Sequence, residues 1–376
     1  MKTLGPGVAW IIFAALLVQT GNALQTDLLG VRAGLEGFSP ATIGFVMAAY
    51  YVGFSAVTLP SHVIVGRFGA VRVILAATVL AAIAIVIAAW WITPLYWGLL
   101  RLLSGAAISI LYISVESWIN AAVENAQRGR VFSVYMTAQM IAMTLAQFLF
   151  AAGSPRTVQL FLLAGALFVS AAVPVLITRR AAPAHGAPPE PFGLARLFAA
   201  SPLGAWLTFL AGASWSIVFA FGPVYARGAG FSVSDTGLFM ACAMAAGAVL
   251  QYPFGYLSDH AGRRVTIIIM TALALLASLF GYWATGEGAA AKLLASALMG
   301  STVFPLYAIS VARTNDSIAP QNRVAAAGGL VLLFGLGSIL GPALSGLAVT
   351  AAGPAGFFML LAATMAACLA AASFAR

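Results

Sequence analysis

The chain of 376 residues is too apolar to be an ordinary soluble protein. Of its residues 62% are hydrophobic and only 7% are charged, with a mean hydropathy of +1.02. Soluble domains average roughly 45–50% apolar and about 25% charged residues. A soluble helical bundle would also need charged outer faces on its helices, and the predicted helices have none. Apolar runs of about 20 residues, long enough to cross a bilayer, recur throughout, so we expect an all-α membrane protein.

The net charge of +9 does not indicate a nucleic-acid partner, because the basic residues are scattered rather than clustered on one face. Cys242 and Cys368 both lie inside apolar runs, which predicts neither a disulfide framework nor a metal site. The N-terminal apolar segment lacks a small-residue cleavage site after a short hydrophobic region. We therefore expect it to be a retained first helix rather than a signal peptide.

Apolar runs, separated by Gly, Pro and charged residues, predict twelve helices. In the first half these are helices over 7–29 and 40–60, a loop over 61–72, a third helix ending near 91, a turn over 92–96, a fourth helix ending near 123, a loop over 124–130, a fifth helix ending near 153 and a sixth ending at 178. In the second half they are helices over 203–225 and 234–257, a ninth ending near 285, a tenth ending near 311, and two more over 324–350 and from 355 to the end.

One long polar stretch, residues 179–202, divides the chain into two halves that repeat each other. At a constant offset of 193 positions, Gly37-Phe38-Ser39 falls on Gly230-Phe231-Ser232. The same offset pairs Gly44 with Gly237, Met47 with Met240, Pro60 with Pro253, Gly69 with Gly262 and Arg130 with Arg323. We predict two parallel repeats, a six-helix bundle over 1–178 and another over 203–376, joined by a cytoplasmic linker over 179–202.

Twelve spans place both termini and the linker on one side of the membrane. Of the 18 Lys and Arg residues, thirteen fall on that side and Arg101 lies inside a helix. The residues on the opposite side are Arg32, Arg156, Arg227 and Lys292. Because positively charged loops stay in the cytoplasm, we expect a multi-pass protein of the bacterial plasma membrane with both termini cytoplasmic.

The loop between the eighth and ninth predicted helices carries a family signature. It reads Gly255-Tyr256-Leu257-Ser258-Asp259-His260-Ala261-Gly262-Arg263-Arg264. This resembles the cytoplasmic motif G-x-L-x-D-R-x-G-R-R of the major facilitator superfamily, with His260 in place of the usual Arg. The resemblance implies two six-helix bundles, related by a pseudo-twofold axis, that rock about a central site while such loops latch the outward-facing state. In the first half Gly66 replaces the Asp, so an acidic latch would be one-sided.

Three further segments extend the resemblance over nearly the whole chain. They are VESWINAAVENAQRGRVFSVYM over 115–136, GPVYARGAGFSVSDTGLFM over 222–240 and GLGSILGPALSGLA over 335–348. Together they resemble the YcaD-like branch of the superfamily. That branch implies a secondary transporter of a small molecule, and it names no substrate.

Two ionisable residues lie inside the fourth predicted helix, where each costs at least about 2.5–3.5 kcal/mol without a partner. Arg101 and Glu116 are about 60° apart around the helix and about 22 Å apart along it, and Gly105 and Tyr112 fall on the same stripe. Arg101-x-x-x-Gly105 resembles the R-x-x-x-G motif of proton-coupled superfamily members. Arg101 could face the cavity and bind an acid or an anionic substrate, or it could be structural and extend toward the surface.

Two carboxylates are candidates for the proton-carrying group. Glu116 could carry the proton or could tie its helix to Arg72 or to the basic loop at Arg128 and Arg130. Asp27, near the outer end of the first helix, could pair with Arg101 or could be an ordinary interfacial residue. The offset of 193 places Leu294, Ile309 and Ala220 opposite Arg101, Glu116 and Asp27, so the buried charge belongs to the first half alone.

Polar and aromatic residues at helical spacing complete the candidate cavity. They are Gln19, Asn22 and Thr26 on the first helix, Tyr112 on the fourth, Gln139 and Gln147 on the fifth, Trp215, Ser216 and Phe219 on the seventh, and Ser301, Thr302 and Tyr307 on the tenth. Such residues equally often bond one helix to another. The glycines at 335, 337, 341 and 346 predict close helix packing. The fifth helix has no G-x-x-x-G-P antiporter motif, which argues against multidrug antiport.

Two rival functions are open. Met240, Cys242 and Met244, with Met136, Met140 and Met143, could carry copper, although Met at helical spacing is usually packing material. The chain could also be a receptor that binds without transporting. No cluster of His, Cys and carboxylates and no phosphate-binding loop indicates an enzyme or an ATP-driven pump. We expect a monomer that contacts membrane lipid, small solutes and protons, with no cofactor, no bound metal and no nucleic acid.

Overall fold

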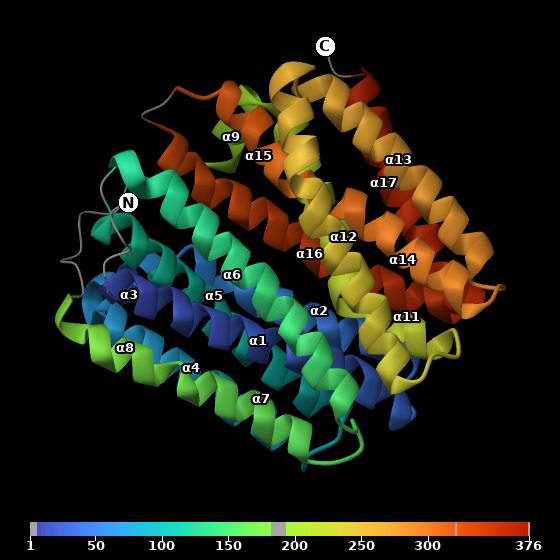
Figure 1. Cartoon of the computed structure of the whole chain (residues 1–376), viewed down its shortest axis with the longest axis horizontal. Coiled ribbons are helices and arrows are strands. Elements are labelled where there is room, and N and C mark those ends of the chain that lie inside the picture. Colours follow the sequence, from blue (N-terminus) through green and yellow to red (C-terminus); the bar gives the residue numbers. More distant parts are fainter. Residues whose placement is uncertain (1–5, 124, 182–192, 320–321, 375–376) are drawn as a thin grey trace. The chain divides into compact units, whose positions relative to one another are not determined.

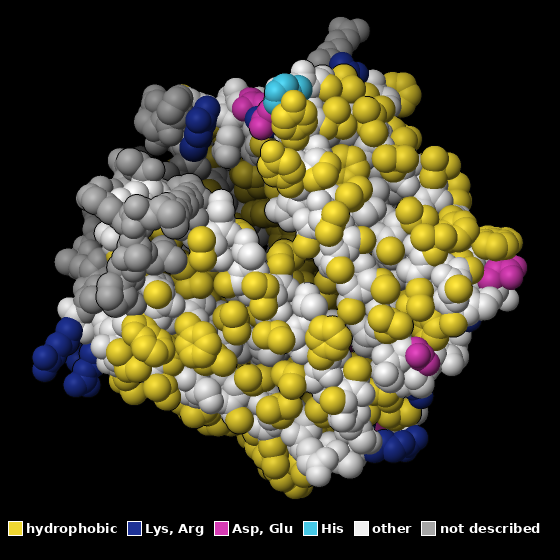
Figure 2. Space-filling view, viewed as in Figure 1, with side chains coloured by type: hydrophobic (Ala, Val, Ile, Leu, Met, Phe, Trp, Pro, Cys, Tyr) yellow, Lys and Arg dark blue, Asp and Glu magenta, His cyan; other side chains and the backbone are white. Residues whose placement is uncertain are grey.

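The computed structural model describes residues 6–123, 125–181, 193–319 and 322–374, and over these the chain is helical with no strand (Figure 1). Eleven described segments are long and apolar enough to cross a membrane. The last of them, Ala325–Phe374, contains two helices separated by a short 3₁₀ turn, so the prediction of twelve spans is confirmed. Figure 2 shows hydrophobic side chains over most of one face, with most charged side chains toward its edges.

The helices of the first half follow the predicted order. They are α1 (Pro6–Leu35), α2 (Pro40–Thr58), α3 (Ser61–Phe68), α4 (Ala70–Ala88), α5 (Pro94–Ala122), α6 (Asn125–Ala152), α7 (Gln159–Ser170), α8 (Ala172–Thr178) and the 3₁₀ turn η1 (Arg179–Ala181).

The second half contains more breaks within its spans. Its elements are α9 (Leu194–Ala200), α10 (Pro202–Ser216), the π-helical turn η2 (Ile217–Phe221), α11 (Gly222–Gly228), α12 (Val233–His260), α13 (Arg263–Ala284), α14 (Ala289–Val303), α15 (Leu306–Asp316), α16 (Arg323–Ala352), the 3₁₀ turn η4 (Gly353–Ala355) and α17 (Gly356–Phe374).

Two segments predicted as loops are helical, and one predicted end is too early. Residues 61–68 form α3, and most of the predicted loop over 124–130 is the first turn and a half of α6. Charged residues at a membrane surface end an apolar run without ending a helix, which explains both errors. Likewise α1 continues from residue 29 to Leu35, because Gly30 packs against Val224 instead of breaking the helix.

Backbone geometry repeats at the offset found in the sequence. Gly37 and Gly230 have φ of 80° and 91°, and Gly69 and Gly262 have φ of 82° and 92°. Only glycine adopts this conformation without strain, which explains its place in both copies. After Gly37 the hydroxyl of Ser39 accepts a hydrogen bond from the backbone of Thr42, and Ser232 accepts one from Asp235 in the same way. Each repeat therefore starts its second span with the same turn and cap.

The described chain forms two compact units that do not coincide with the two repeats. One unit contains Met1–Leu29 and Val52–Pro188, and the other contains Gly30–Tyr51 and Pro189–Arg376. Within the second unit the start of α2 packs on α16. The backbone N–H of Ala41 donates to Thr350 Oγ1 at 3.1 Å, and a Cβ on Gly44 would lie 3.0 Å from the Cα of Gly346. Much of the predicted linker, residues 182–192, lies outside the described residues.

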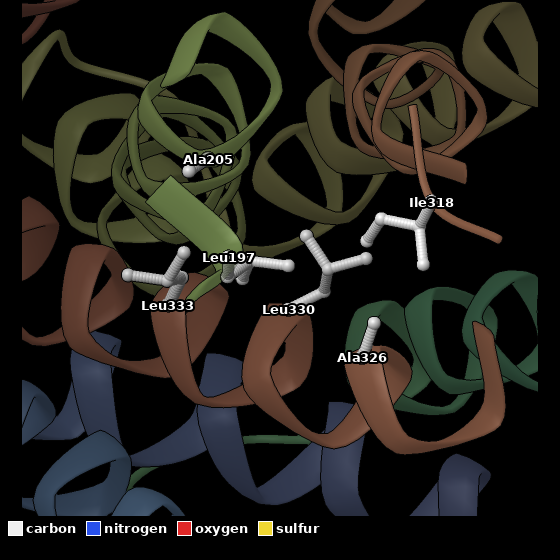
Figure 3. Close-up of a cluster of buried hydrophobic side chains, with 6 residues drawn as sticks. All are labelled: Leu197, Ala205, Ile318, Ala326, Leu330 and Leu333. Carbon is white, nitrogen blue, oxygen red and sulfur yellow. The ribbon is translucent and has the colours of Figure 1, made fainter. Parts of the chain in front are cut away.

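The end of the predicted linker is an ordered helix of the second unit. Leu197 of α9 is fully buried in a cluster with Ala205, Ile318, Ala326, Leu330 and Leu333. Figure 3 shows its side chain between Leu330 and Leu333 of α16. Leu194 and Phe198 of the same helix also pack against this cluster, so apolar residues at the end of a polar stretch attach it to the helical bundle.

Leu197→Ala is expected to lower the free energy of unfolding by about 2–5 kcal/mol, because it leaves a cavity in this cluster. Thermal unfolding of the purified protein measures the change. The matched control is Ala199→Ser, on the exposed side of the same helix, which should stay within about 0.5 kcal/mol of the parent. Equal stability of both variants would contradict the buried position of Leu197.

Candidate functional site

The first unit contains a layer of polar side chains buried between α1, α5 and α6. Asp27 of α1 is 0% exposed, and its Oδ2 accepts a hydrogen bond from Gln147 Nε2 of α6 at 2.8 Å. Among the described residues neither Asp27 Oδ1 nor Gln147 Oε1 has a hydrogen-bond partner. This contact places a buried carboxyl group beside an amide whose oxygen can still accept a hydrogen bond.

Two more contacts join α1 to α5. The hydroxyl of Tyr112 donates to Gln19 Oε1, and Gln25 Nε2 donates to Ser104 Oγ at 2.8 Å. Gln25 also donates to Asn22 Oδ1 at 3.1 Å, which places the predicted residue Asn22 in the same network. The polar face of α1 thus lies against the polar stripe of α5 over more than two helical turns.

Arg101 lies further along this stripe and is 1% exposed. It lines a cavity of about 10 Å³, room for one water, together with Gln25, Trp97 and Ser104. The indole of Trp97 donates to the carbonyl of Ala88 at 3.1 Å, which fixes one wall of this cavity. An ion pair between Arg101 and Asp27 is not among the ion pairs that the described residues form.

Glu116 of α5 and Gln139 of α6 are two further polar residues of the first unit. Glu116 is half-buried, and its Oε1 accepts a hydrogen bond from the hydroxyl of Tyr135 at 3.4 Å. Of its predicted basic partners, Arg72 forms no ion pair with a described residue, and the side chains of Arg128 and Arg130 lie outside the described residues. Gln139 is half-buried, and its Oε1 has no hydrogen-bond partner in the described part of the chain. A polar contact therefore joins each pair of the three helices α1, α5 and α6.

Trp215 and Tyr307 belong to an aromatic cluster in the second unit. The ring of Trp215 lies 4.5 Å from Phe219 and 6.0 Å from both Phe304 and Phe334, and Tyr307 lies 4.7 Å from Phe334. The π-helical turn η2 starts two residues after Trp215 and shifts the register of the seventh span. Such turns are frequent at functional sites.

The loop motif forms a compact ionic contact between three helices of the second unit. Arg263 Nη1 lies 2.5 Å from Asp259 Oδ1 on α12, and its Nε lies 3.0 Å from Asp316 Oδ2 on α15. Arg264 donates to the carbonyls of Ala372 and Ser373 at the end of α17, at 3.0 and 2.7 Å. Arg264 therefore caps the C-terminus of α17.

The remaining motif residues take different positions. Gly262 has a φ of 92° and starts α13. A Cβ on Gly255 would meet nothing within 4 Å, so packing gives no reason for that glycine. His260, which replaces the usual Arg, stacks on Tyr256 with ring centroids 3.9 Å apart and directs Nδ1 at the Tyr256 carbonyl.

Arg263→Gln is expected to lower the free energy of unfolding, because two ion pairs of about 0.2–1 kcal/mol each are lost. The difference from the parent should shrink in 1 M salt, which screens exposed charges. Arg313→Gln is the control, since Arg313 lies on α15, donates to the hydroxyl of Ser317 and forms no ion pair with a described residue. A salt-independent loss, or an equal loss in both variants, would argue against the ion pairs.

In the described part of the chain neither cysteine belongs to a cluster of histidines, cysteines and carboxylates. Cys242 is half-buried and Cys368 is buried, and no three His, Cys, Asp or Glu residues of the described chain lie close enough together to hold a metal ion.

Four residues of the buried layer were not predicted: Gln25, Trp97, Ser104 and Tyr135. Gln25 follows Asn22 by three positions, and Ser104 follows Arg101 by three. Residues three apart lie on the same face of a helix, so the candidates Asn22 and Arg101 could have indicated these two neighbours. The sequence neighbours of Trp97 and Tyr135 are a mixture of apolar and polar residues. Nothing in this pattern distinguishes either aromatic residue from one that only packs between helices.

Comparisons with known proteins show similarity to membrane transporters over most of the chain. The sequence model of the Major Facilitator Superfamily matches residues 4–308 and 204–376. An uncharacterised MFS-type transporter of Enterobacter sp. (strain 638) is 25% identical over 350 residues, covering 91% of this chain and 88% of its own. The YcaD protein of Escherichia coli (strain K12), an uncharacterised MFS-type transporter, is 25% identical over 356 residues with the same coverage. These relatives confirm the resemblance to the YcaD-like branch.

Solved structures share the fold at low sequence identity. A bacterial homologue of the human lysosomal transporter Spinster superposes with a TM-score of 0.80 at 16% identity, covering 99% of this chain and 97% of its own. The nucleoside transporter NupG also gives a TM-score of 0.80, at 18% identity, covering 98% and 97%. With the family match over most of the chain, this places the protein among membrane transporters rather than enzymes. The chain belongs to the major facilitator superfamily.

Proposed function

We propose that the chain is a secondary transporter that moves a small organic solute across the bacterial plasma membrane by alternating access, coupled to protons. It acts as a monomer in this proposal, with both termini in the cytoplasm. The observation that carries the proposal is the hydrogen bond between Asp27 and Gln147, because it places inside the first unit a carboxyl group that forms no ion pair with a described residue.

The amide of Gln147 suits both charge states of this carboxyl group. Its Nε2 donates to the ionised form, as in the structure. Its Oε1 has no partner among the described residues and can accept from the protonated form after the amide rotates. Asp27 can therefore keep a hydrogen bond to Gln147 in both its ionised and its protonated form. In an ion pair, protonation of the carboxylate would leave the buried cation without its counter-charge.

The groups available to a solute are polar and aromatic. In the first unit Gln19, Tyr112 and Arg101 supply hydrogen-bond donors and acceptors, and in the second unit Trp215 and Tyr307 supply aromatic faces. Binding sites for small molecules combine apolar walls with a few placed polar groups of this kind. This composition favours an organic solute over a metal ion.

A ligand screen followed by flux measurement tests the function. Purified protein is screened by thermal shift against metabolites and drugs, and hits are tested for uptake into proteoliposomes with an imposed pH gradient. A hit whose stabilisation is lost in Arg101→Lys but kept in Arg156→Lys would support the buried site. Ligand binding without any flux in sealed vesicles would instead support a receptor and overturn the proposal.

A further inference from the structure

The first unit contains a large groove that the buried polar layer does not use. Its volume is about 390 Å³, within the roughly 300–1,000 Å³ of typical small-molecule sites. It is lined by the end of α2, by α3, by the first half of α4 and by the middle of α5. Its contribution from α5 is Ala106, Ala107 and Ile110, which lie about 180° around the helix from the stripe of Arg101 and Tyr112.

Small residues explain why the groove exists. Four alanines line it, and larger side chains at these positions would fill the space. They are Ala76 and Ala77 of α4 and Ala106 and Ala107 of α5. One turn away α2 and α5 meet closely, since a Cβ on Gly53 would lie 3.1 Å from the backbone N of Ala106. The groove therefore begins next to the close contact of α2 and α5, and α3 lines its other side.

The groove opens on the apolar outer surface of the unit. Its rim residues Phe68 and Leu80 are 52% and 38% exposed, and the neighbouring Val63 is 59% exposed. The predicted spans of α2 and α4 end at Thr58 and begin at Ala70, so α3 lies at the boundary between membrane and water. The groove therefore runs from this boundary into the apolar layer, where hydrocarbon chains are the surrounding solvent.

Two cations lie at the boundary end, and no acid among the described residues forms an ion pair with either of them. Arg72 is the one charged residue that lines the described groove, and the guanidinium of Arg67 lies 5.5 Å from the ring centre of Phe68. Neither arginine is in an ion pair with a described residue. The sequence contains no Asp or Glu from residue 37 to residue 115. Arg72 also lies in the first turn of α4, where unsatisfied backbone N–H groups favour an anion.

We propose that this groove binds one anionic phospholipid, with an acyl chain along the alanines of α4 and α5 and the phosphate at Arg72 and Arg67. An apolar channel that ends at two unbalanced guanidinium groups matches the two parts of such a lipid. A soluble anion would find too few polar groups in the groove, and a neutral apolar solute would gain nothing from the arginines. In the predicted orientation the lipid belongs to the cytoplasmic leaflet, whose anionic lipids attract basic residues.

Native mass spectrometry of the full-length protein with an equimolar mixture of phosphatidylglycerol and phosphatidylcholine tests this site. The parent should retain phosphatidylglycerol with about fivefold or greater preference, as expected for at least one arginine at the headgroup. Arg72→Gln should bring the preference close to parity, whereas Arg156→Gln, an exposed arginine in another loop, should leave it unchanged.

Blocking the groove tests the acyl chain separately. Ala76→Phe should reduce retention of both lipids, and Ile83→Phe, at an exposed position of α4 outside the groove, should not. Glycerol 3-phosphate, the headgroup without chains, should not displace the lipid. Equal retention of the two lipids by the parent, equal behaviour of Arg72→Gln and Arg156→Gln, or displacement by glycerol 3-phosphate would each overturn the proposal.

Discussion

Asp27→Asn is expected to abolish accumulation of the solute against its gradient while leaving solute exchange intact. Asparagine has nearly the same shape as aspartate and can still hydrogen-bond Gln147, so the contact between α1 and α6 should survive. It cannot ionise, so the variant carries no proton. We expect accumulation driven by a pH gradient to fall at least about tenfold, within the usual range of coupling between two sites.

Two flux measurements in proteoliposomes separate coupling from folding. In the first an imposed pH gradient drives net uptake or efflux, and in the second labelled solute exchanges with unlabelled solute without a gradient. The variant should fail the first and pass the second, and its exchange rate should not depend on pH. Retention of exchange shows that the protein is folded and binds its solute.

Glu116→Gln is the matched control for this experiment. Glu116 is half-buried, and its carboxylate accepts a long hydrogen bond, of 3.4 Å, from the hydroxyl of Tyr135. We expect Glu116→Gln to keep gradient-driven transport. If Asp27→Asn accumulates solute normally and Glu116→Gln does not, the proton carrier is Glu116. If both variants accumulate solute normally, proton coupling through these carboxylates is wrong.

The number and order of the spans could be predicted from the sequence because hydrophobicity alone decides them. Each span must satisfy its backbone as a helix in lipid, so an apolar run of sufficient length has one available structure. At the membrane surface this constraint ends. There α3, the start of α6 and α9 are helical although their polarity suggested loops. The apolar residues Leu194, Leu197 and Phe198 indicate that α9 is attached to the bundle.

The residues of the buried layer could be predicted more readily than their partners. Asp27, Gln147, Gln19 and Tyr112 were selected as polar residues inside spans, a property of each position by itself. The partner of Asp27 is Gln147, which is 120 positions away, and this pairing depends on how α1 and α6 are rotated against each other. Rotation is set by packing along whole helices, such as the glycine contacts of the second unit, which the residue pattern of one helix does not determine.

Gly337→Ala is expected to destabilise the protein strongly, because it forces apart the two most closely packed helices of the second unit. A Cβ on Gly337 of α16 would lie 2.8 Å from the carbonyl carbon of Phe209 and 3.1 Å from the backbone N of Ala213, both on α10. Backbone atoms inside a helix cannot move aside as a side chain can. We expect a loss of about 1–3 kcal/mol, and a larger loss for Gly337→Leu.

The same helix provides a control substitution that should stabilise the protein instead of destabilising it. A Cβ on Gly328 would meet nothing within 4 Å, so Gly328→Ala should gain up to about 1 kcal/mol from the higher helix propensity of alanine. Thermal unfolding in detergent, followed by size-exclusion chromatography with fluorescence detection, measures both variants. A Gly337→Ala variant as stable as Gly328→Ala would mean that α10 and α16 are not in backbone contact there. The hydrogen bond from Ser338 Oγ to the Gly212 carbonyl, at 3.0 Å, depends on the same close approach of α10 and α16, so that result would contradict this hydrogen bond as well.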